Sequence, residues 1–309
     1  MYSLPKRRTL VHKAIEPRKL SAKVQAALAE RNDDLFEVKY DGCHVILIKS
    51  EGKAYAFSRQ GEPVLAAMDH VLRDLERIPT DNFALFAEAW HPLLDHSTIN
   101  GTFRRQYVAD GAELLEAVVF DYVPLADFEA GACPVRFKTR RDAATAIVLA
   151  AQGLYESFEE SPLRTSYISQ TVDQCQHYVN HCRDVYNEEF AIDGFMRKDR
   201  DGLWKAGSGS GGESVKLKDH MSIDVKVLAV LEGKGKFVDM VGSIQVLWGL
   251  RELVVGGGKL TDKERKLYWD FPSKIVGRIV EVHGLSESQH GMIREPRFIR
   301  FRDDKTEGE

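Results

Sequence analysis

One lysine stands where a hydrophobic strand gives way to a polar turn, in the segment Glu37-Val38-Lys39-Tyr40-Asp41-Gly42. Partial burial and nearby cations would lower the pKa of such an amine and free its lone pair for nucleophilic attack. The segment therefore predicts Lys39 as a nucleophile with a lowered pKa. A surface lysine is the commoner outcome for so short a segment, so companion motifs must decide.

Six further motifs follow the lysine segment in order. They are Ser58-Arg59-Gln60-Gly61, Phe86-Ala87-Glu88-Ala89-Trp90, Val119-Phe120-Asp121-Tyr122, Asp193-Gly194-Phe195-Met196-Arg197-Lys198, Val215-Lys216-Leu217-Lys218 and Arg294-Glu295-Pro296-Arg297-Phe298-Ile299-Arg300-Phe301-Arg302-Asp303-Asp304-Lys305. The series resembles the ordered motifs of covalent nucleotidyltransferases, and most closely those of ATP-dependent DNA ligases of the small bacteriophage type. The resemblance extends from about Val11 to Lys305.

This resemblance implies a three-step reaction. The lysine attacks the α-phosphate of ATP and expels pyrophosphate, AMP moves to the 5′-phosphate of nicked double-stranded DNA, and the 3′-hydroxyl then displaces AMP. Such displacements need cations on the phosphates and carboxylates that hold Mg²⁺, or Mn²⁺ as a substitute. The implied cofactors are therefore ATP and Mg²⁺, and the implied partner is nicked duplex DNA.

The resemblance also implies the catalytic residues. Lys39 is the nucleophile, and Asp41 belongs to the same motif. Lys216 and Lys218 are two residues apart on an expected strand, so both point to one face and can reach the α-phosphate. Arg294 would orient the pyrophosphate, which requires the two expected domains to close and reopen.

Six side chains are implied in nucleotide binding: Glu37, His44, Arg59, Glu88, Phe120 and Lys198. By the resemblance, Glu37 contacts the adenine amino group and Phe120 stacks on the base. Arg59 and Glu88 hold the ribose. Glu88 and Asp193 form the acidic pair beside the metal.

The chain departs from the family pattern at two positions. His44 stands where the family usually has an arginine that serves the 5′-phosphate of the nick, so His44 would do so when protonated or through a water. Asp193 stands where glutamate is usual, which shortens the reach toward the metal by one methylene. Lys198 is a further candidate for the phosphate-binding cluster.

The elements that must position these residues mix helix and strand. Helices are expected over 21–31, 66–77, 138–155 and 171–190, and strands over 36–49, 54–58, 83–90 and 117–123. After residue 220 short strands with glycine turns, over 223–232, 244–248, 275–283 and 297–301, predict a small β-barrel. The expected fold class is α+β, with an adenylyltransferase domain over 1–219 and an OB-fold domain over 220–309.

Two cysteines and two histidines lie within the helix expected over 171–190. At 100° per residue, Cys175 and Cys182 share one face, and His177 and His181 lie roughly opposite. Four ligands cannot converge on a metal in that arrangement, so buried thiols and exposed histidines are expected.

Composition sets further bounds. The 309 residues are 43% hydrophobic and 29% charged, as in ordinary globular proteins, which excludes a disordered or fibrous chain. A net charge of -4 means that a polyanion must be held by a lined groove, with the basic hairpin Gly233-Lys234-Gly235-Lys236-Phe237 as a candidate, and binding should be salt-sensitive. The four cysteines and the lack of an apolar span or signal peptide suggest a cytoplasmic monomer without membrane contact.

Two other functions use part of the same pattern. An RNA ligase or an mRNA-capping guanylyltransferase would use the same lysine chemistry, although the segment ending in Asp303-Asp304-Lys305 favours a DNA ligase. A nick-binding protein without catalysis is disfavoured, because such a protein has no need of Lys39.

Overall fold

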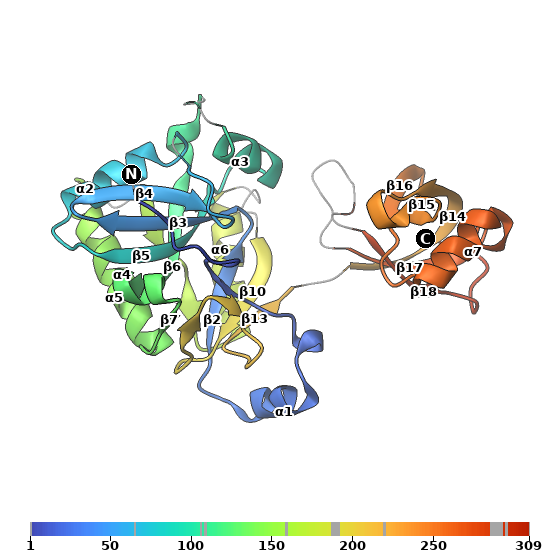
Figure 1. Cartoon of the computed structure of the whole chain (residues 1–309), viewed down its shortest axis with the longest axis horizontal. Coiled ribbons are helices and arrows are strands. Elements are labelled where there is room, and N and C mark those ends of the chain that lie inside the picture. Colours follow the sequence, from blue (N-terminus) through green and yellow to red (C-terminus); the bar gives the residue numbers. More distant parts are fainter. Residues whose placement is uncertain are drawn as a thin grey trace. The chain divides into compact units, whose positions relative to one another are not determined.

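The computed structural model describes residues 2–64, 66–105, 107, 110–157, 160–186, 192–218, 221–284, 293 and 296–308. The chain divides into two units, Met1–Leu217 and Lys218–Glu309, called here the first and second unit (Figure 1). The domain boundary expected at residues 219 and 220 lies outside the described residues.

Two sheets, one antiparallel and one mainly so, carry most of the motif residues of the first unit. The larger has the strand order β4 (Lys53–Ser58), β3 (Cys43–Ser50), β5 (Phe83–Trp90), β6 (Glu116–Pro124) and β8 (Leu163–Thr165), of which only the β6–β8 pair is parallel. The smaller has the order β13 (Ser214–Leu217), β10 (Ile192–Lys198), β2 (Leu35–Tyr40) and β9 (Ile168–Ser169). The motif residues of the first unit are therefore shared between two sheets.

The single strand expected over 36–49 is wrong. The structure ends β2 at Tyr40 and begins β3 at Cys43, and the two strands belong to different sheets. Gly42 lies in the break, where an added Cβ would come within 2.2 Å of the Ala89 carbonyl oxygen. Only glycine can pass this close to β5. The close approach at Gly42 therefore lets the chain cross from one sheet to the other shortly after Lys39.

The described residues of the first unit also form six α-helices: α1 (Ala22–Glu30), α2 (Asp69–Arg77), α3 (His96–Phe103), α4 (Leu125–Ala130), α5 (Phe137–Gln152) and α6 (Val172–Val185). Ser21 caps α1 by accepting from the Val24 amide, as its sequence predicts. The Cys175 and Cys182 thiols are buried on α6, and the two histidines of that helix are exposed, which confirms the predicted faces.

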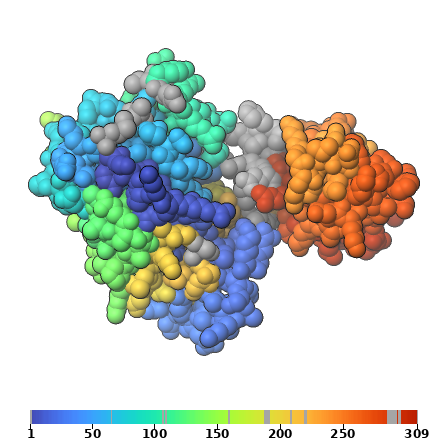
Figure 2. Space-filling view, viewed as in Figure 1, coloured from blue at the N-terminus to red at the C-terminus, as the bar shows by residue number. Residues whose placement is uncertain are grey.

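Shorter elements complete the first unit: the strands β1 (His12–Lys13), β7 (Ala132–Cys133), β11 (Trp204–Lys205) and β12 (Gly207–Ser208), and the 3₁₀-helices Pro17–Lys19 and Ala112–Leu114. β1 pairs in parallel with β12, so the N-terminal segment lies beside Gly207 and Ser208. Figure 2 shows this dark-blue segment crossing one face of the first unit beside yellow residues.

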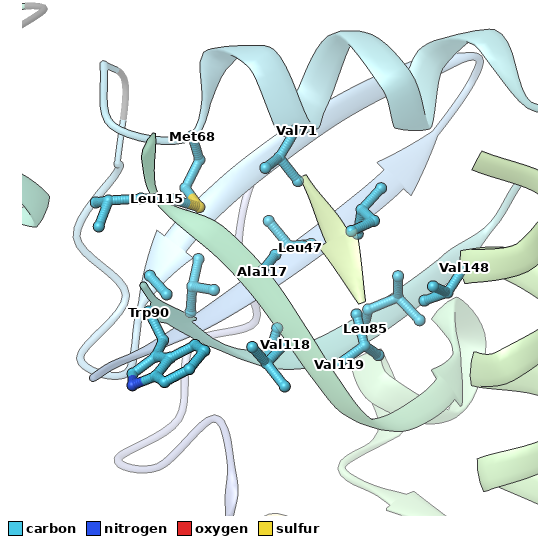
Figure 3. Close-up of a cluster of buried hydrophobic side chains, with 14 of the residues drawn as sticks. Leu47, Met68, Val71, Leu85, Trp90, Leu115, Ala117, Val118, Val119 and Val148 are labelled. Carbon is cyan, nitrogen blue, oxygen red and sulfur yellow. The ribbon is translucent and has the colours of Figure 1, made fainter. Parts of the chain in front are cut away.

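The larger sheet is covered on both faces. Along β3, Leu47 packs into one buried cluster and Ile46 and Ile48 pack into another. Figure 3 shows Met68 and Val71, at the start of α2, pointing toward the strands of the sheet. Burial on both faces explains why these strands are continuous apolar runs rather than alternating ones.

The second unit is a closed five-stranded barrel, which confirms the predicted one. Its order is β14 (Met221–Glu232), β15 (Val241–Trp248), β16 (Arg251–Gly256), β18 (Arg297–Phe301) and β17 (Ile279–Gly284). Helix α7 (Asp262–Asp270) starts with a capping box between Thr261 and Glu264, and 3₁₀-helices span Gly235–Phe237 and Pro272–Lys274. None of the helices in the described part of the chain has the length and apolar run to cross a bilayer.

Candidate active site

Lys39 lies near the end of β2, one residue before the chain leaves its sheet. Its Nζ is 2.6 Å from Oδ2 of Asp193, which comes from β10. The pairing of β10 with β2 shifts register between Ile192 and Phe195, and Gly194 within this bulge has φ +96°. The bulge turns Asp193 toward the amine, and its backbone conformation favours glycine at position 194.

The pKa of Lys39 is raised, so the predicted lowering is wrong. Burial of the amine lowers its pKa, but the carboxylates of Glu88, Asp193 and Asp41 together outweigh burial. Cations were expected around this lysine, but the fold places the carboxylates of Glu88, Asp193 and Asp41 near it instead. Lys39 is therefore an ammonium at neutral pH in the protein alone, and attack requires this proton to leave.

The same environment changes the Glu88 carboxylate. Burial raises its pKa to about 7; Lys39 acts in the opposite direction, and Asp41 and Asp193 add to the increase. The Gly42 amide hydrogen-bonds to the Glu88 carboxylate. A further cation beside these carboxylates would relieve their repulsion.

A divalent cation fits this demand. No cluster of three or more His, Cys, Asp or Glu ligands occurs among the residues that the structure describes. Mg²⁺ does not need such a cluster, because it is commonly held by one or two carboxylates, phosphate oxygens and water. Glu88 and Asp193 are chemically suited to the protein's share of such a site.

Cations line the same face of the smaller sheet. Glu37, Met196 and Lys216 form one row across β2, β10 and β13, so their side chains share a face, together with that of Lys39 two residues along β2. Lys216 and Lys218 were expected on one strand, but β13 ends at Leu217, so Lys218 lies one residue beyond it. Its reach to the α-phosphate stays a prediction.

Lys198 joins this face from the end of β10. Its Nζ is 3.7 Å from Glu37 Oε2 and 5.4 Å from the centroid of the Phe120 ring. Glu37 itself is 1% exposed and accepts a 3.1 Å hydrogen bond from Ser166 Oγ. Glu37 and Phe120, which were predicted to contact the base, therefore both lie close to Lys198.

His44 lies opposite Glu88 in the β3–β5 ladder. Burial lowers its pKa to about 3, and the nearby Arg59, Lys198 and Lys39 contribute to the decrease. The imidazole is therefore neutral at physiological pH in the protein alone, contrary to the protonated form expected from the sequence, and phosphate contact through a water stays a prediction. The ring instead meets that of Phe120 edge to face, with centroids 5.5 Å apart.

Arg59 and Arg294 complete the predicted set. Arg59 is an exposed residue in the turn after β4, and its charge acts on His44. Arg294 lies outside the described residues.

A cavity of about 30 Å³ lies beside these rings, with His44, Phe120 and Lys198 in its wall. Three buried polar atoms without a hydrogen-bond partner belong to wall residues: His12 Nε2, His44 Nδ1 and Glu213 Oε2. The volume is enough for a water, and the polar wall suits one.

Sequence analysis missed two buried arginines next to the site. Arg140 and Arg141 on α5 are each 4% exposed and pair with Asp121 and Glu37. A signal was available, since both lie three or four residues before Ala144 and seven before Ile147 or Val148, on the apolar face of the helix expected over 138–155.

Comparisons with known proteins identify the family. The model of the ATP dependent DNA ligase domain matches residues 16–218, and that of the DNA ligase OB-like domain matches residues 232–302. The chain belongs to the ATP-dependent DNA ligase family. The match over residues 16–218 contains the lysine segment and the carboxylates of Glu88 and Asp193.

Curated relatives of this ligase-family chain are archaeal. It is 25% identical to a DNA ligase of Methanococcus maripaludis over 96% of this chain and 53% of the relative. It is 24% identical to a DNA ligase of Methanocorpusculum labreanum over 87% of this chain and 52% of the relative. The chain thus spans about half the length of these relatives.

Solved structures show the shared fold. The structure named Pmar-Lig_PreS3 has a TM-score of 0.72 and 22% identity, covering 95% of this chain and 68% of its own. A Lig E DNA ligase has a TM-score of 0.67 and 15% identity, covering 94% and 98%. The bacteriophage T7 ATP-dependent DNA ligase has a TM-score of 0.54 and 18% identity, covering 94% and 98%. This ligase-family chain accordingly has the predicted α+β fold, a nucleotidyltransferase domain with an OB-like domain.

Proposed function

We propose that this chain is an ATP-dependent DNA ligase that seals nicks in duplex DNA through an AMP-lysine intermediate on Lys39. The observation that carries the proposal is the position of this amine, 2.6 Å from Asp193 and influenced by Glu88 and Asp41. A partly buried ammonium influenced by three carboxylates is a reactive group held protonated until its surroundings change. The family membership supports the same chemistry.

In the first step Lys39 Nζ bonds to the α-phosphorus of ATP, and the bond to pyrophosphate breaks. Before attack, one Nζ proton lies against Asp193 Oδ2, and it would pass through this carboxylate to water as the new bond forms. Glu88 and Asp193 would hold Mg²⁺, or Mn²⁺ in its place. The metal would neutralise charge on the phosphates, and it would also weaken the hold of the two carboxylates on the lysine proton. Lys39 then carries AMP as a phosphoramidate.

Positioning and charge neutralisation carry the remaining steps. Lys216 and Lys198 lie on the face that carries Lys39 and would hold phosphate oxygens. Lys218 and Arg294 would add to this set, with Arg294 on the pyrophosphate. The 5′-phosphate of the nick then takes AMP from the lysine, and the 3′-hydroxyl displaces it.

The nucleotide would lie between the two sheets. Phe120 would stack on the base, Glu37 would accept a hydrogen bond from the adenine amino group, and Arg59 and Glu88 would hold the ribose. We further propose that the chain acts as a monomer in the cytoplasm.

Labelled nucleotides test this function. The protein is incubated with Mg²⁺ and labelled ATP or GTP, then with nicked DNA or nicked RNA, beside Lys39→Ala and the surface control Lys23→Ala. We expect label from ATP, sealing of DNA, loss of both in Lys39→Ala and retention of both in Lys23→Ala. Label from GTP alone would indicate a capping guanylyltransferase, and sealing of RNA alone an RNA ligase; either result contradicts the proposal.

A further inference from the structure

Helix α5 presents two consecutive arginines to the interior of the first unit. Arg140 and Arg141 are each 4% exposed, although neither belongs to the motifs that identified the family. A buried guanidinium costs free energy unless its donors are paired, so their partners indicate what the two residues support.

Arg140 holds Asp121 with both arms of its guanidinium. Nε donates to Asp121 Oδ1 at 2.9 Å and Nη2 donates to Oδ2 at 3.0 Å. Nη1 donates to the carbonyls of Val135 at 2.6 Å and Gly202 at 3.0 Å. This two-point pairing fixes the direction of Asp121 as well as its position.

Asp121 directly follows a bulge in β6. Phe86 on β5 faces Asp121 and Ala87 faces Val119, which leaves Phe120 as the extra residue between them. A bulge of this kind bends a strand and redirects its side chains. The pair of Arg140 and Asp121 therefore fixes the strand beside the aromatic ring proposed to stack on the base.

Arg141 supports the other wall of the same site. Its Nε is 3.4 Å from Glu37 Oε1, and its Nη1 donates to the Val119 carbonyl at 3.4 Å. Nη2 donates to the Ser166 carbonyl, and Ser166 Oγ donates to Glu37. One side chain thus ties Glu37 on the smaller sheet to β6 on the larger sheet.

We propose that Arg140 and Arg141 are positioning residues that separately set the two walls of the purine pocket. Arg140 sets the stacking wall through Asp121 and Phe120, and Arg141 sets the hydrogen-bonding wall through Glu37. The inference rests on the proposed adenylylation at Lys39. Stacking accepts any purine, whereas a carboxylate that accepts from the 6-amino group distinguishes adenine from a purine that lacks it.

The contributions of the two walls to nucleotide binding can be separated by comparing ATP with purine riboside triphosphate, which lacks the 6-amino group. The readouts are KM and the maximal rate of AMP-lysine formation with each nucleotide, together with the thermal unfolding temperature. The variants are Arg141→Met and the double variant Asp121→Leu with Arg140→Met, which removes both charges of the buried pair at once. Lys138→Met, on the exposed side of α5, is the matched control.

The double variant should raise KM for both nucleotides by a similar factor of about ten, with their ratio unchanged. Arg141→Met should raise KM for ATP about tenfold and leave KM for the analogue near the wild-type value, so the preference for ATP is lost. Lys138→Met should change neither constant. If a methionine variant does not fold, Arg140→Lys and Arg141→Lys, which keep the charge without the planar fork, should show the same split to a smaller extent.

Unchanged KM values in folded variants would overturn the inference. A fall in maximal rate alone, with the preference for ATP intact, would also overturn it, since it would indicate a general structural role. Equal loss of ATP preference in both variants would refute the division between the walls. Failure of the wild-type protein to form AMP-lysine with any nucleotide would instead remove the proposed function itself.

Discussion

The two units differ in how much charge they bury. Among the described residues, the buried charged side chains of the first unit are Asp34, Glu37, Asp41, Lys49, Asp74, Asp121, Arg140, Arg141 and Lys198. Those of the second unit, within the same described set, are Asp224 and Arg265. Because buried charge is costly unless paired, the first unit keeps such groups in pairs within its interior, several of them beside the candidate site, and the barrel offers mainly its surface.

The surface of the barrel is less basic than its sequence suggests. In the arginine-rich segment, Arg300 pairs with Glu281, and Arg302 pairs with Asp224 and Asp304. Lys305 also pairs with Asp224. Paired charges present little net potential to a polyanion, which directs attention to the exposed lysines of the hairpin tip at 233–237.

The largest effect on activity should come from replacing the carboxylates beside Lys39 in the first unit. Glu88→Gln or Asp193→Asn should slow AMP-lysine formation by about 10²–10³-fold, because each removes a charge proposed to hold Mg²⁺. The matched control is Glu252→Gln on an exposed strand of the barrel, which should leave the rate within about twofold. Single-turnover kinetics with labelled ATP measure the rates of these variants. An equal loss of rate in Glu252→Gln would contradict the difference between the two units.

The second effect is on stability and has a defined pH window. The folded-state pKa of Glu88 is raised from 4.5 to about 7, so its ionised form costs stability above pH 7, and this cost disappears below pH 4.5. Glu88→Gln should therefore stabilise the first unit at pH 8 by about 1 to 3 kcal/mol, with the gain declining as the pH falls. Urea unfolding at pH 5 and pH 8 measures the gain, and equal gains at both values would contradict the shift.

A smaller effect is expected from the barrel. Replacing Lys234 and Lys236 with Gln should weaken binding to nicked DNA and make the slope of log affinity against log salt less negative by about 2. AMP-lysine formation should stay unchanged, because neither lysine belongs to the residues proposed to bind ATP or pyrophosphate. A salt slope equal to that of the wild-type protein would remove the hairpin tip from the DNA contact.

The smallest effect concerns His44. Its pKa is lowered to about 3, so the ring stays neutral from pH 5.5 to 8. The ratio of sealing rates between the wild-type protein and His44→Gln should therefore be constant over this range. A ratio that changes about tenfold across one pH unit would show that the imidazole titrates after all.

Sequence patterns predicted the elements better than the interactions between them. The apolar run at Phe83–Trp90 and the strand at Arg297–Phe301 have the expected bounds, since burial and strand propensity act locally. The break at Asp41 and Gly42 was missed, because the need for glycine there comes from Ala89, a residue on another strand. Local pattern carries no information on such a long-range approach.

The charges around Lys39 show the same limit. The sequence marked Lys39, Glu88 and Asp193 as candidates but gave the wrong direction for the lysine's pKa. That direction depends on which charged groups the fold brings within a few ångströms, and the bulge at Gly194 that presents Asp193 is a tertiary feature. The buried arginines of α5 could have been identified by helical periodicity, but their partners on β2 and β6 could not.

The most direct test of the account is to locate AMP on the protein. After incubation with ATP and Mg²⁺, the chain is digested and its peptides are analysed by mass spectrometry under conditions that preserve the acid-labile phosphoramidate. The account predicts a single adenylylated peptide containing Lys39, which disappears in Lys39→Ala. AMP on a different lysine, or an unchanged yield in Lys39→Ala, would contradict it.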